Sequence, residues 1–217
     1  MIIAIDGPAG SGKTTTARRI AEKLGILYLD TGATYRALTL AALEKDLDLN
    51  DAGSLEELAK NIDLRLETNR VFLQSKDVSQ AIRTPRIDKN ISMVVKHPGV
   101  REVMVNLQRD IAKGNNCIAE GRDVATVVFP KAEFKFYLDA DEKKRAQRRY
   151  KELQEKEINI EFAEVKSDLT KRDSADKNRV VGPLKVSEDA IIIDTTDLSI
   201  EDTADEIIKY INSNKLH

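Results

Sequence analysis

The 217 residues are enough for one globular domain with small insertions, because single domains usually contain about 100–200 residues. Hydrophobic residues make up 41% and charged residues 33% of the chain, which excludes wholesale disorder and allows a sizeable core. The net charge of -2 argues against a nucleic-acid-binding protein, and no apolar run reaches the roughly 20 residues that a membrane span requires.

Short apolar runs alternate with helical patterns along most of the chain. The first run, residues 2–5, ends in a glycine-rich turn and is typical of a buried strand. Residues 13–24 then follow helical spacing, and Gly25 is placed to close that helix. A second run at residues 26–29 ends in a polar turn, after which residues 35–44 form an alanine-rich helical pattern.

The second half of the chain repeats this alternation. Three more apolar runs, at residues 116–119, 134–138 and 190–193, are each followed by turn residues and a helical pattern. The last helix follows Ser199, which is a good N-cap with Asp202 three residues on. Strands that alternate with helices predict an α/β fold, here a five-stranded parallel sheet flanked by helices on both faces.

Two stretches interrupt the alternation. Residues 62–78 show period-two patterning around the turn-like Thr68-Asn69-Arg70, which predicts a small antiparallel insertion. Residues 152–184 are highly charged and nearly free of aromatic residues, which predicts an exposed and mobile helical segment.

Residues 7–14 match the pattern G-x-x-x-x-G-K-[ST] completely and lie between a predicted strand and a predicted helix. The glycines let backbone N–H groups turn toward phosphate oxygens, and the helix N-terminus adds partial positive charge. Lys13 is placed to reach the β- and γ-phosphates, and the Thr14 hydroxyl is placed to bind Mg²⁺. We therefore expect a nucleoside triphosphate to be held by Gly7, Pro8, Ala9, Gly10, Ser11, Gly12, Lys13, Thr14 and Thr15.

Several arginines stand in positions that suit a second phosphorylated ligand. Arg36 follows the second predicted strand and Arg122 the third, so both lie at the carboxyl edge of a parallel sheet, beside the phosphate loop. Arg172 and Arg179 add positive charge from the charged segment, and planar guanidinium groups grip phosphate in a bidentate manner. The chain lacks the Asn-Lys-x-Asp motif of a switch GTPase, which argues for an acceptor substrate instead.

Four segments, in order along most of the chain, resemble the bacterial cytidylate kinase (CMP/dCMP kinase) family within the nucleoside monophosphate kinases. They are residues 5–8 with the phosphate loop, residues 29–36, residues 118–123 with 126–130, and residues 172–179 with Pro183-Leu184. The resemblance implies transfer of the γ-phosphoryl group of ATP to CMP or dCMP, with Mg²⁺ as cofactor. It also implies a core at residues 1–61, 93–151 and 185–217, an acceptor-binding insertion at about 62–92, and a lid at about 152–184.

The resemblance further implies three groups of acceptor-binding residues. Thr31, Arg101 and Asp123 would read the cytosine ring, which presents an amine donor beside a ring-nitrogen acceptor. Ser92, Arg172 and Asp176 would hold the sugar, and Arg36, Arg122 and Arg179 the α-phosphate. Arg145 would lie against ATP. Catalysis would rest on positioning and charge neutralisation by Lys13, Mg²⁺, Arg122 and Arg179 rather than on a protein nucleophile.

Two other functions stay open on the sequence. A P-loop kinase for another small acceptor, such as UMP, would share these features, and a nucleotide-gated binding module would hydrolyse ATP without a monophosphate. We expect only small-molecule partners, CMP and dCMP, with neither nucleic acid nor membrane, and a monomeric protein. The N-terminus shows no signal-peptide features, and the one cysteine, Cys117, cannot form an internal disulfide, so we expect a cytoplasmic protein.

Overall fold

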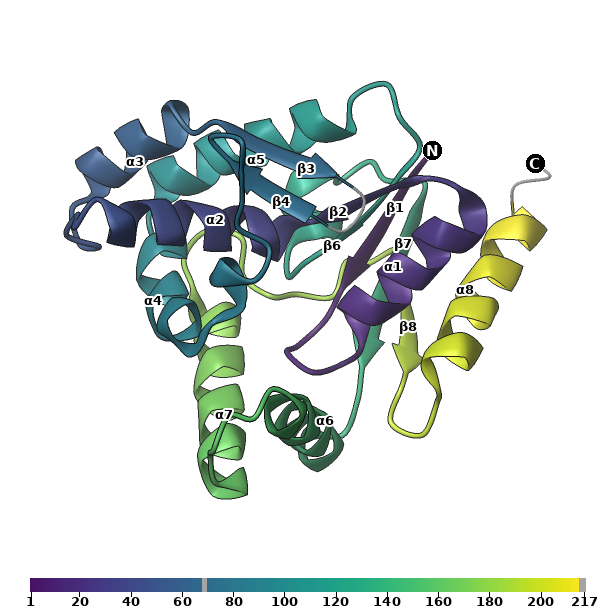
Figure 1. Cartoon of the computed structure of the whole chain (residues 1–217). Helices are drawn as coiled ribbons and strands as arrows, with labels where there is room; N and C mark the ends of the chain where they lie inside the picture. The colour runs from purple at the N-terminus through teal and green to yellow at the C-terminus, as the bar shows by residue number, and fades with distance from the viewer. Residues whose placement is uncertain (68–69, 215–217) are drawn as a thin grey trace.

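The central sheet of the computed structural model, which describes residues 1–67 and 70–214, has five parallel strands (Figure 1). In chain order they are β1 (Ile2–Asp6), β2 (Leu27–Asp30), β6 (Cys117–Glu120), β7 (Phe134–Asp139) and β8 (Ile191–Asp194). They lie in the order β2-β6-β1-β7-β8, and every neighbouring pair is parallel. The predicted fold class is confirmed, and each predicted strand agrees with the structure to within one residue.

Helices cover both faces of this sheet (Figure 1). The helices of the described residues are α1 (Lys13–Leu24), α2 (Thr31–Glu44), α3 (Ala52–Lys60), α4 (Pro85–Val95), α5 (Pro98–Ala112), α6 (Glu142–Glu155), α7 (Phe162–Asn178) and α8 (Ile200–Asn214). Of these, α1 and α8 pack on one face of the sheet and α5 on the other. In β1, Ile3 and Ile5 pack under α1 and α8, whereas Ala4 faces α5, because successive strand residues point to opposite faces. Within the described residues, no helix combines the length and the apolar character that crossing a membrane requires.

A three-stranded antiparallel sheet follows α3. Its strands are β3 (Leu64–Glu67), β4 (Arg70–Leu73) and β5 (Lys76–Asp77), which confirms the predicted antiparallel insertion. The predicted turn residues Thr68 and Asn69 lie outside the described residues. The small sheet shares a hydrophobic core with α2, α3, α4 and α5, so it is anchored to the side of the molecule that carries these helices. The 3₁₀ turn η1 (Ala81–Arg83) and α4 follow, and the predicted boundary at residue 92 falls inside α4.

The charged segment at residues 152–184 is helical as predicted and contains the end of α6 and all of α7. The two helices pack on one another through Leu153, Val165 and Leu169, which are buried. The same apolar cluster includes Ala9 of the glycine-rich loop. The segment therefore has an inner face that seats it against this loop, although most of its outer face is exposed.

Two helical predictions were wrong in detail. α2 begins at Thr31 and not at residue 35, because Asp30 caps it: the Asp30 carboxylate accepts a hydrogen bond from the backbone N–H of Ala33 at 2.8 Å. After β6, the expected helix is only the short π-helical turn η2 (Val124–Val128). The chain leaves this turn for β7 within a few residues.

The cap predicted at the start of α8 is present. The Ser199 hydroxyl oxygen accepts the backbone N–H of Asp202 at 3.1 Å, and the Asp202 carboxylate accepts the Ser199 hydroxyl at 2.6 Å. Ser199→Ala should therefore lower the free energy of unfolding by about 1 kcal/mol, measured by urea denaturation. Ser213→Ala, at an exposed position near the other end of α8, is the matched control and should change it by less than about 0.5 kcal/mol. Equal losses in the two variants would contradict the capping role.

Candidate active site

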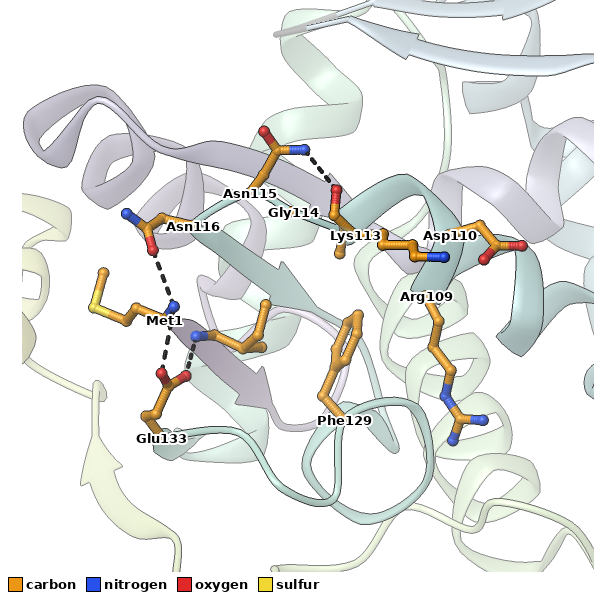
Figure 2. Close-up of a pocket in the computed structure, with 11 residues that line it drawn as sticks. Met1, Arg109, Asp110, Lys113, Gly114, Asn115, Asn116, Phe129 and Glu133 are labelled. Atoms are coloured by element: carbon orange, nitrogen blue, oxygen red, sulfur yellow. Dashed lines mark hydrogen bonds and ion pairs between the residues drawn. The ribbon is translucent and has the colours of Figure 1, made fainter.

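A cavity of about 670 Å³ opens at the amino ends of the strands (Figure 2). Figure 2 shows the Met1 amine between two partners: it lies 2.9 Å from Asn116 Oδ1 and 3.3 Å from Glu133 Oε1. Arg109 at the rim donates to two backbone carbonyl groups of η2, each at 2.8 Å. These charges are satisfied within the protein, and the glycine-rich loop lies at the opposite edge of the sheet. We therefore place the active site at the carboxyl ends of the strands, where parallel sheets bind their ligands.

The glycine-rich loop leaves β1 at Gly7 and enters α1 at Lys13, which is the strand–loop–helix context that the sequence predicts. Gly7 has no room for a side chain, since an added Cβ would lie 2.1 Å from the carbonyl oxygen of Leu138 in β7. Gly12, the N-cap of α1, has φ of 86°, a conformation that favours glycine. The Lys13 ammonium donates to the carbonyl oxygen of Pro8 at 2.6 Å, so the loop curls around a buried positive charge.

The polar side chains of Lys13, Thr14 and Glu120 lie together at the glycine-rich loop. The Thr14 hydroxyl donates to Glu120 Oε1 at 2.7 Å. Burial and the nearby Arg122 together lower the pKa of Lys13 to about 7, although Glu120 opposes them. Burial and the neighbouring Asp30 raise the pKa of Glu120. A bound anion beside Lys13 and a cation beside Thr14 and Glu120 would restore the ordinary charge of both groups.

Arg101 and Asp123, two of the three predicted base-reading residues, form a buried ion pair. The Arg101 side chain is only 2% exposed, and its Nε and Nη1 atoms have no hydrogen-bond partner among the described residues. Its guanidinium group lies over the ring of Tyr35, 5.4 Å from the centroid. Buried donors without partners are costly, so this ion pair suits a ligand that brings acceptors. Thr31, the third predicted reader, donates to the backbone carbonyl oxygen of Glu120 at 2.8 Å.

Two predicted phosphate-binding arginines share the Asp176 carboxylate. Arg122 Nε donates to Asp176 at 2.8 Å, and Arg179 Nη1 lies 3.6 Å from it. Arg179 Nη2 also donates to Asp123 at 3.0 Å, which links this pair to the base-reading residues. Gly182, with φ of 60°, covers the same place, because an added Cβ would lie 2.2 Å from the Asp123 carboxylate. The end of α7 and the loop after it therefore fold over Asp123.

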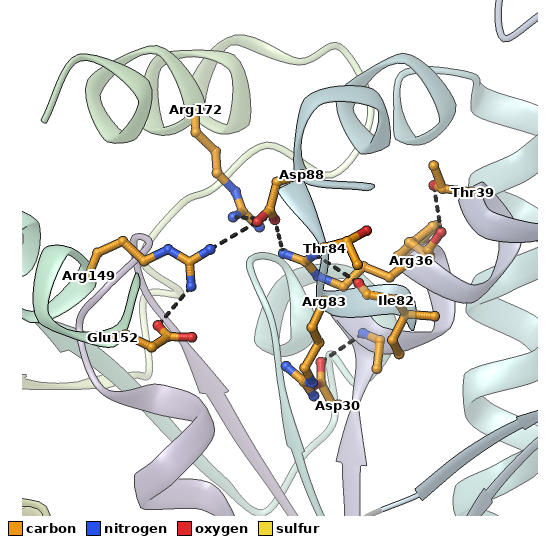
Figure 3. Close-up of polar contacts among 12 residues, drawn as sticks. Asp30, Arg36, Thr39, Ile82, Arg83, Thr84, Asp88, Arg149, Glu152 and Arg172 are labelled. Carbon is orange, nitrogen blue, oxygen red and sulfur yellow. Dashed lines mark hydrogen bonds and ion pairs between the residues drawn. The ribbon is translucent and has the colours of Figure 1, made fainter. Parts of the chain in front are cut away.

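Asp88 of α4 joins arginines from three other helices (Figure 3). Arg36 of α2 donates to it at 2.6 Å and Arg149 of α6 at 2.9 Å, and Arg172 of α7 lies 3.9 Å from it. Burial, with Arg122 and Arg36 nearby, lowers the pKa of Arg172 to about 10. The arginines predicted to bind the phosphate and the sugar are thus neighbours in the fold.

Three other predicted residues lie outside this cluster of arginines and carboxylates. Arg145 is buried behind the glycine-rich loop, where its Nη1 donates to the carbonyl oxygen of Ala9 at 2.9 Å and to Asp173 at 2.5 Å. Asp173 in turn accepts the backbone N–H of Ala9 at 3.1 Å. Ser92 is exposed on α4, and Thr15 is exposed in the first turn of α1.

Sequence reasoning missed four carboxylates of this site, at Asp6, Asp88, Glu120 and Asp173. Asp6 and Glu120 are charged residues that end apolar strands at the carboxyl edge of the sheet, a signal that could have identified them. Asp88 and Asp173 gain their importance from partners on other helices, and the sequence carries no local signal for those contacts.

Comparisons with known proteins show the family. A model of the cytidylate kinase family matches residues 3–213. The chain is 47% identical to the cytidylate kinase of Caldanaerobacter subterraneus subsp. tengcongensis, with 98% of this chain and 95% of that protein covered. It is 46% identical to the cytidylate kinase of Fusobacterium nucleatum subsp. nucleatum, with 99% of each protein covered. A shikimate kinase from Bacteroides thetaiotaomicron matches with a TM-score of 0.51 at 13% identity over 98% of each chain, which shows a shared fold alone. This chain belongs to the cytidylate kinase family.

Proposed function

We propose that this chain transfers the γ-phosphoryl group of ATP to CMP or dCMP and releases CDP or dCDP. The observation that carries the proposal is the buried pair of Arg101 and Asp123. Cytosine presents an amine donor beside ring and carbonyl acceptors, so the carboxylate accepts from the amine while the guanidinium group donates to the ring. The partnerless nitrogens of Arg101 would then gain acceptors. Membership of the cytidylate kinase family supports the same acceptor.

The glycine-rich loop holds ATP in this proposal. Its backbone and Lys13 bind the phosphates, and the lowered pKa of Lys13 supports an anion beside this group. The Thr14 hydroxyl and the Glu120 carboxylate beside it suit Mg²⁺, since hydroxyl and carboxylate oxygens are the ligands it prefers. Bound there, Mg²⁺ would neutralise charge on the phosphates. Arg145 supports the ATP-binding loop by donating a hydrogen bond to the carbonyl oxygen of Ala9.

The arginine cluster holds the acceptor. Arg36, Arg122 and Arg179 bind its α-phosphate, and Arg172 and Asp176 bind its sugar. Ser92, which is exposed outside the cluster, stays a predicted contact of the sugar. Residues 152–184 act as a lid, which the contacts of α7 with the glycine-rich loop and of Arg179 with Asp123 support. The chain needs no protein nucleophile, because phosphoryl transfer requires positioning and charge neutralisation. We infer a monomer, and a lone buried cysteine suits the cytoplasm.

An acceptor panel tests the proposal against its alternatives. We expect ADP release with ATP and CMP or dCMP, and much less with UMP or AMP. Faster turnover with UMP would point to the rival kinase. ADP release at the same rate without any monophosphate would point to a nucleotide-gated binding module.

Lys13→Ala should lower phosphoryl transfer at least about a hundredfold while the fold persists, because this lysine binds the charge of the ligand and does not pack in the hydrophobic core.

ATP should raise the lowered pKa of Lys13, so the wild type takes up a proton on binding ATP at pH 8 and binds ATP more weakly as pH rises from 7 to 9. Calorimetry in two buffers of different ionisation enthalpy measures this uptake, and the variant should lack it. Equal uptake in both proteins would contradict the role of Lys13.

Asp123→Asn should lower kcat/KM for CMP about ten- to a hundredfold, since a charged hydrogen-bond partner of a buried group is worth about 1–3 kcal/mol. The variant keeps the side-chain volume, and ATP affinity should change little. Steady-state kinetics with CMP and binding of ATP check both statements. Asp110→Asn, exposed at the end of α5, is the control and should match the wild type. Unchanged CMP kinetics in Asp123→Asn would remove this residue from base recognition.

Asp176→Ala should reduce the ratio of kcat/KM for CMP to that for dCMP, because the carboxylate accepts a hydrogen bond from the 2′-hydroxyl that dCMP lacks. A lost bond of about 1 kcal/mol corresponds to a roughly fivefold change in the ratio. Asp176 also pairs with Arg122 and Arg179. If orienting these arginines is its whole role, both acceptors weaken by one factor and the ratio stays constant. Asp168→Asn, exposed on the same helix, is the control.

A further inference from the structure

Asp88 lies between arginines of different helices, and the proposed function assigns it no role. Arg36 uses both terminal nitrogens within the protein: Nη2 donates to Asp88 at 2.6 Å, and Nη1 donates to the carbonyl oxygen of Ile82 at 3.2 Å (Figure 3). Two of the five N–H donors of Arg36 are therefore already used, one on each terminal nitrogen. An acceptor phosphate that grips both terminal nitrogens in a bidentate manner competes with these contacts.

The positive groups around Asp88 are crowded. Arg172 has a lowered pKa because it is buried and lies near Arg122 and Arg36, which repel it. Burial alone would raise the pKa of Asp88, yet Arg36, Arg172 and Arg149 outweigh that effect and keep it below its usual range. Asp88 is therefore ionised at neutral pH, and it supplies negative charge where several guanidinium groups meet.

Asp88 also connects separate parts of the molecule. It belongs to α4, whereas Arg149 and Arg172 belong to α6 and α7. Its side chain is 24% exposed and that of Arg36 is 12% exposed, so their pair is screened less than one on an open surface. These ion pairs connect α4 to α6 and α7.

We propose that Asp88 is the internal counter-anion of the acceptor-phosphate arginines, and that the phosphate of the acceptor displaces it on binding. Asp88 thereby sets the affinity for the acceptor and holds the proposed lid closed without it. This inference rests on the proposed function, because it takes Arg36 and Arg172 to be acceptor-binding residues. It concerns the competition between two anions and not the chemistry of transfer.

The test compares Asp88→Asn with Asp88→Glu and with a matched control. Glu152→Gln removes another carboxylate of Arg149, one that pairs with it at 2.7 Å on the far side from Arg36 (Figure 3). We expect Asp88→Asn to bind CMP about three- to tenfold more tightly by calorimetry, because the competing anion is gone. Inhibition by cytidine, which lacks the phosphate, should not change. Asp88→Glu and Glu152→Gln should bind CMP as the wild type does.

Hydrogen exchange on the free protein gives a second readout that needs no acceptor. Amides of residues 162–178 should exchange faster in Asp88→Asn than in the wild type or Glu152→Gln, and saturating CMP should remove the difference. Weaker CMP binding in Asp88→Asn would overturn the proposal and make Asp88 a residue that positions the arginines for phosphate. Unchanged exchange would overturn the closing role. Failure of the wild type to use CMP would instead refute the proposed function, which the acceptor panel shows separately.

Discussion

The buried carboxylate of Asp6 joins the two halves of the site. It accepts the backbone N–H groups of Val124 and Ala125, each at 2.8 Å. Asp6 directly precedes the glycine-rich loop, and Val124 directly follows Asp123, so one side chain fixes this loop relative to the pair that we propose reads the base. Burial raises the pKa of Asp6 to about 6, while the two backbone hydrogen bonds favour the charged form and oppose the rise. The carboxylate is therefore ionised at neutral pH, and the link that sets the spacing of the two sites is intact there.

Charges are also balanced within the protein on the proposed acceptor side. The guanidinium groups that we propose bind the acceptor phosphate repel one another, and an uncompensated buried charge is strongly destabilising. Carboxylates that lie between the guanidinium groups compensate their charge: Asp88, Asp123 and Asp176 each contact two or more arginines. A ligand phosphate then exchanges one set of charged hydrogen bonds for another, so its affinity is the difference between the two sets and not their sum.

The sequence predicts the layers of this fold well because they depend on local patterns. Apolar runs locate the five strands, and the loop pattern locates the phosphate site, since both are read from adjacent residues. The start of α2 at Thr31 could not be read from helical periodicity, because one Asp30 cap decides it. The partners of Asp88 could not be predicted from the sequence for a different reason. Asp88 meets Arg36 and Arg149 only after α2, α4 and α6 have packed, and nothing near residue 88 in the sequence records that packing.

One face of α7 contacts both proposed substrate sites. Asp173 accepts the backbone N–H of Ala9 in the donor loop, and Asp176, three residues on, accepts Arg122 on the acceptor side. Residues three apart share a helix face, so a shift of α7 would change both contacts together. An enzyme that moves a phosphoryl group between two small molecules has to exclude water until both are present. Because α7 contacts both the donor loop and the arginines around Asp176, we expect a movement of this helix to act on both proposed substrate sites together.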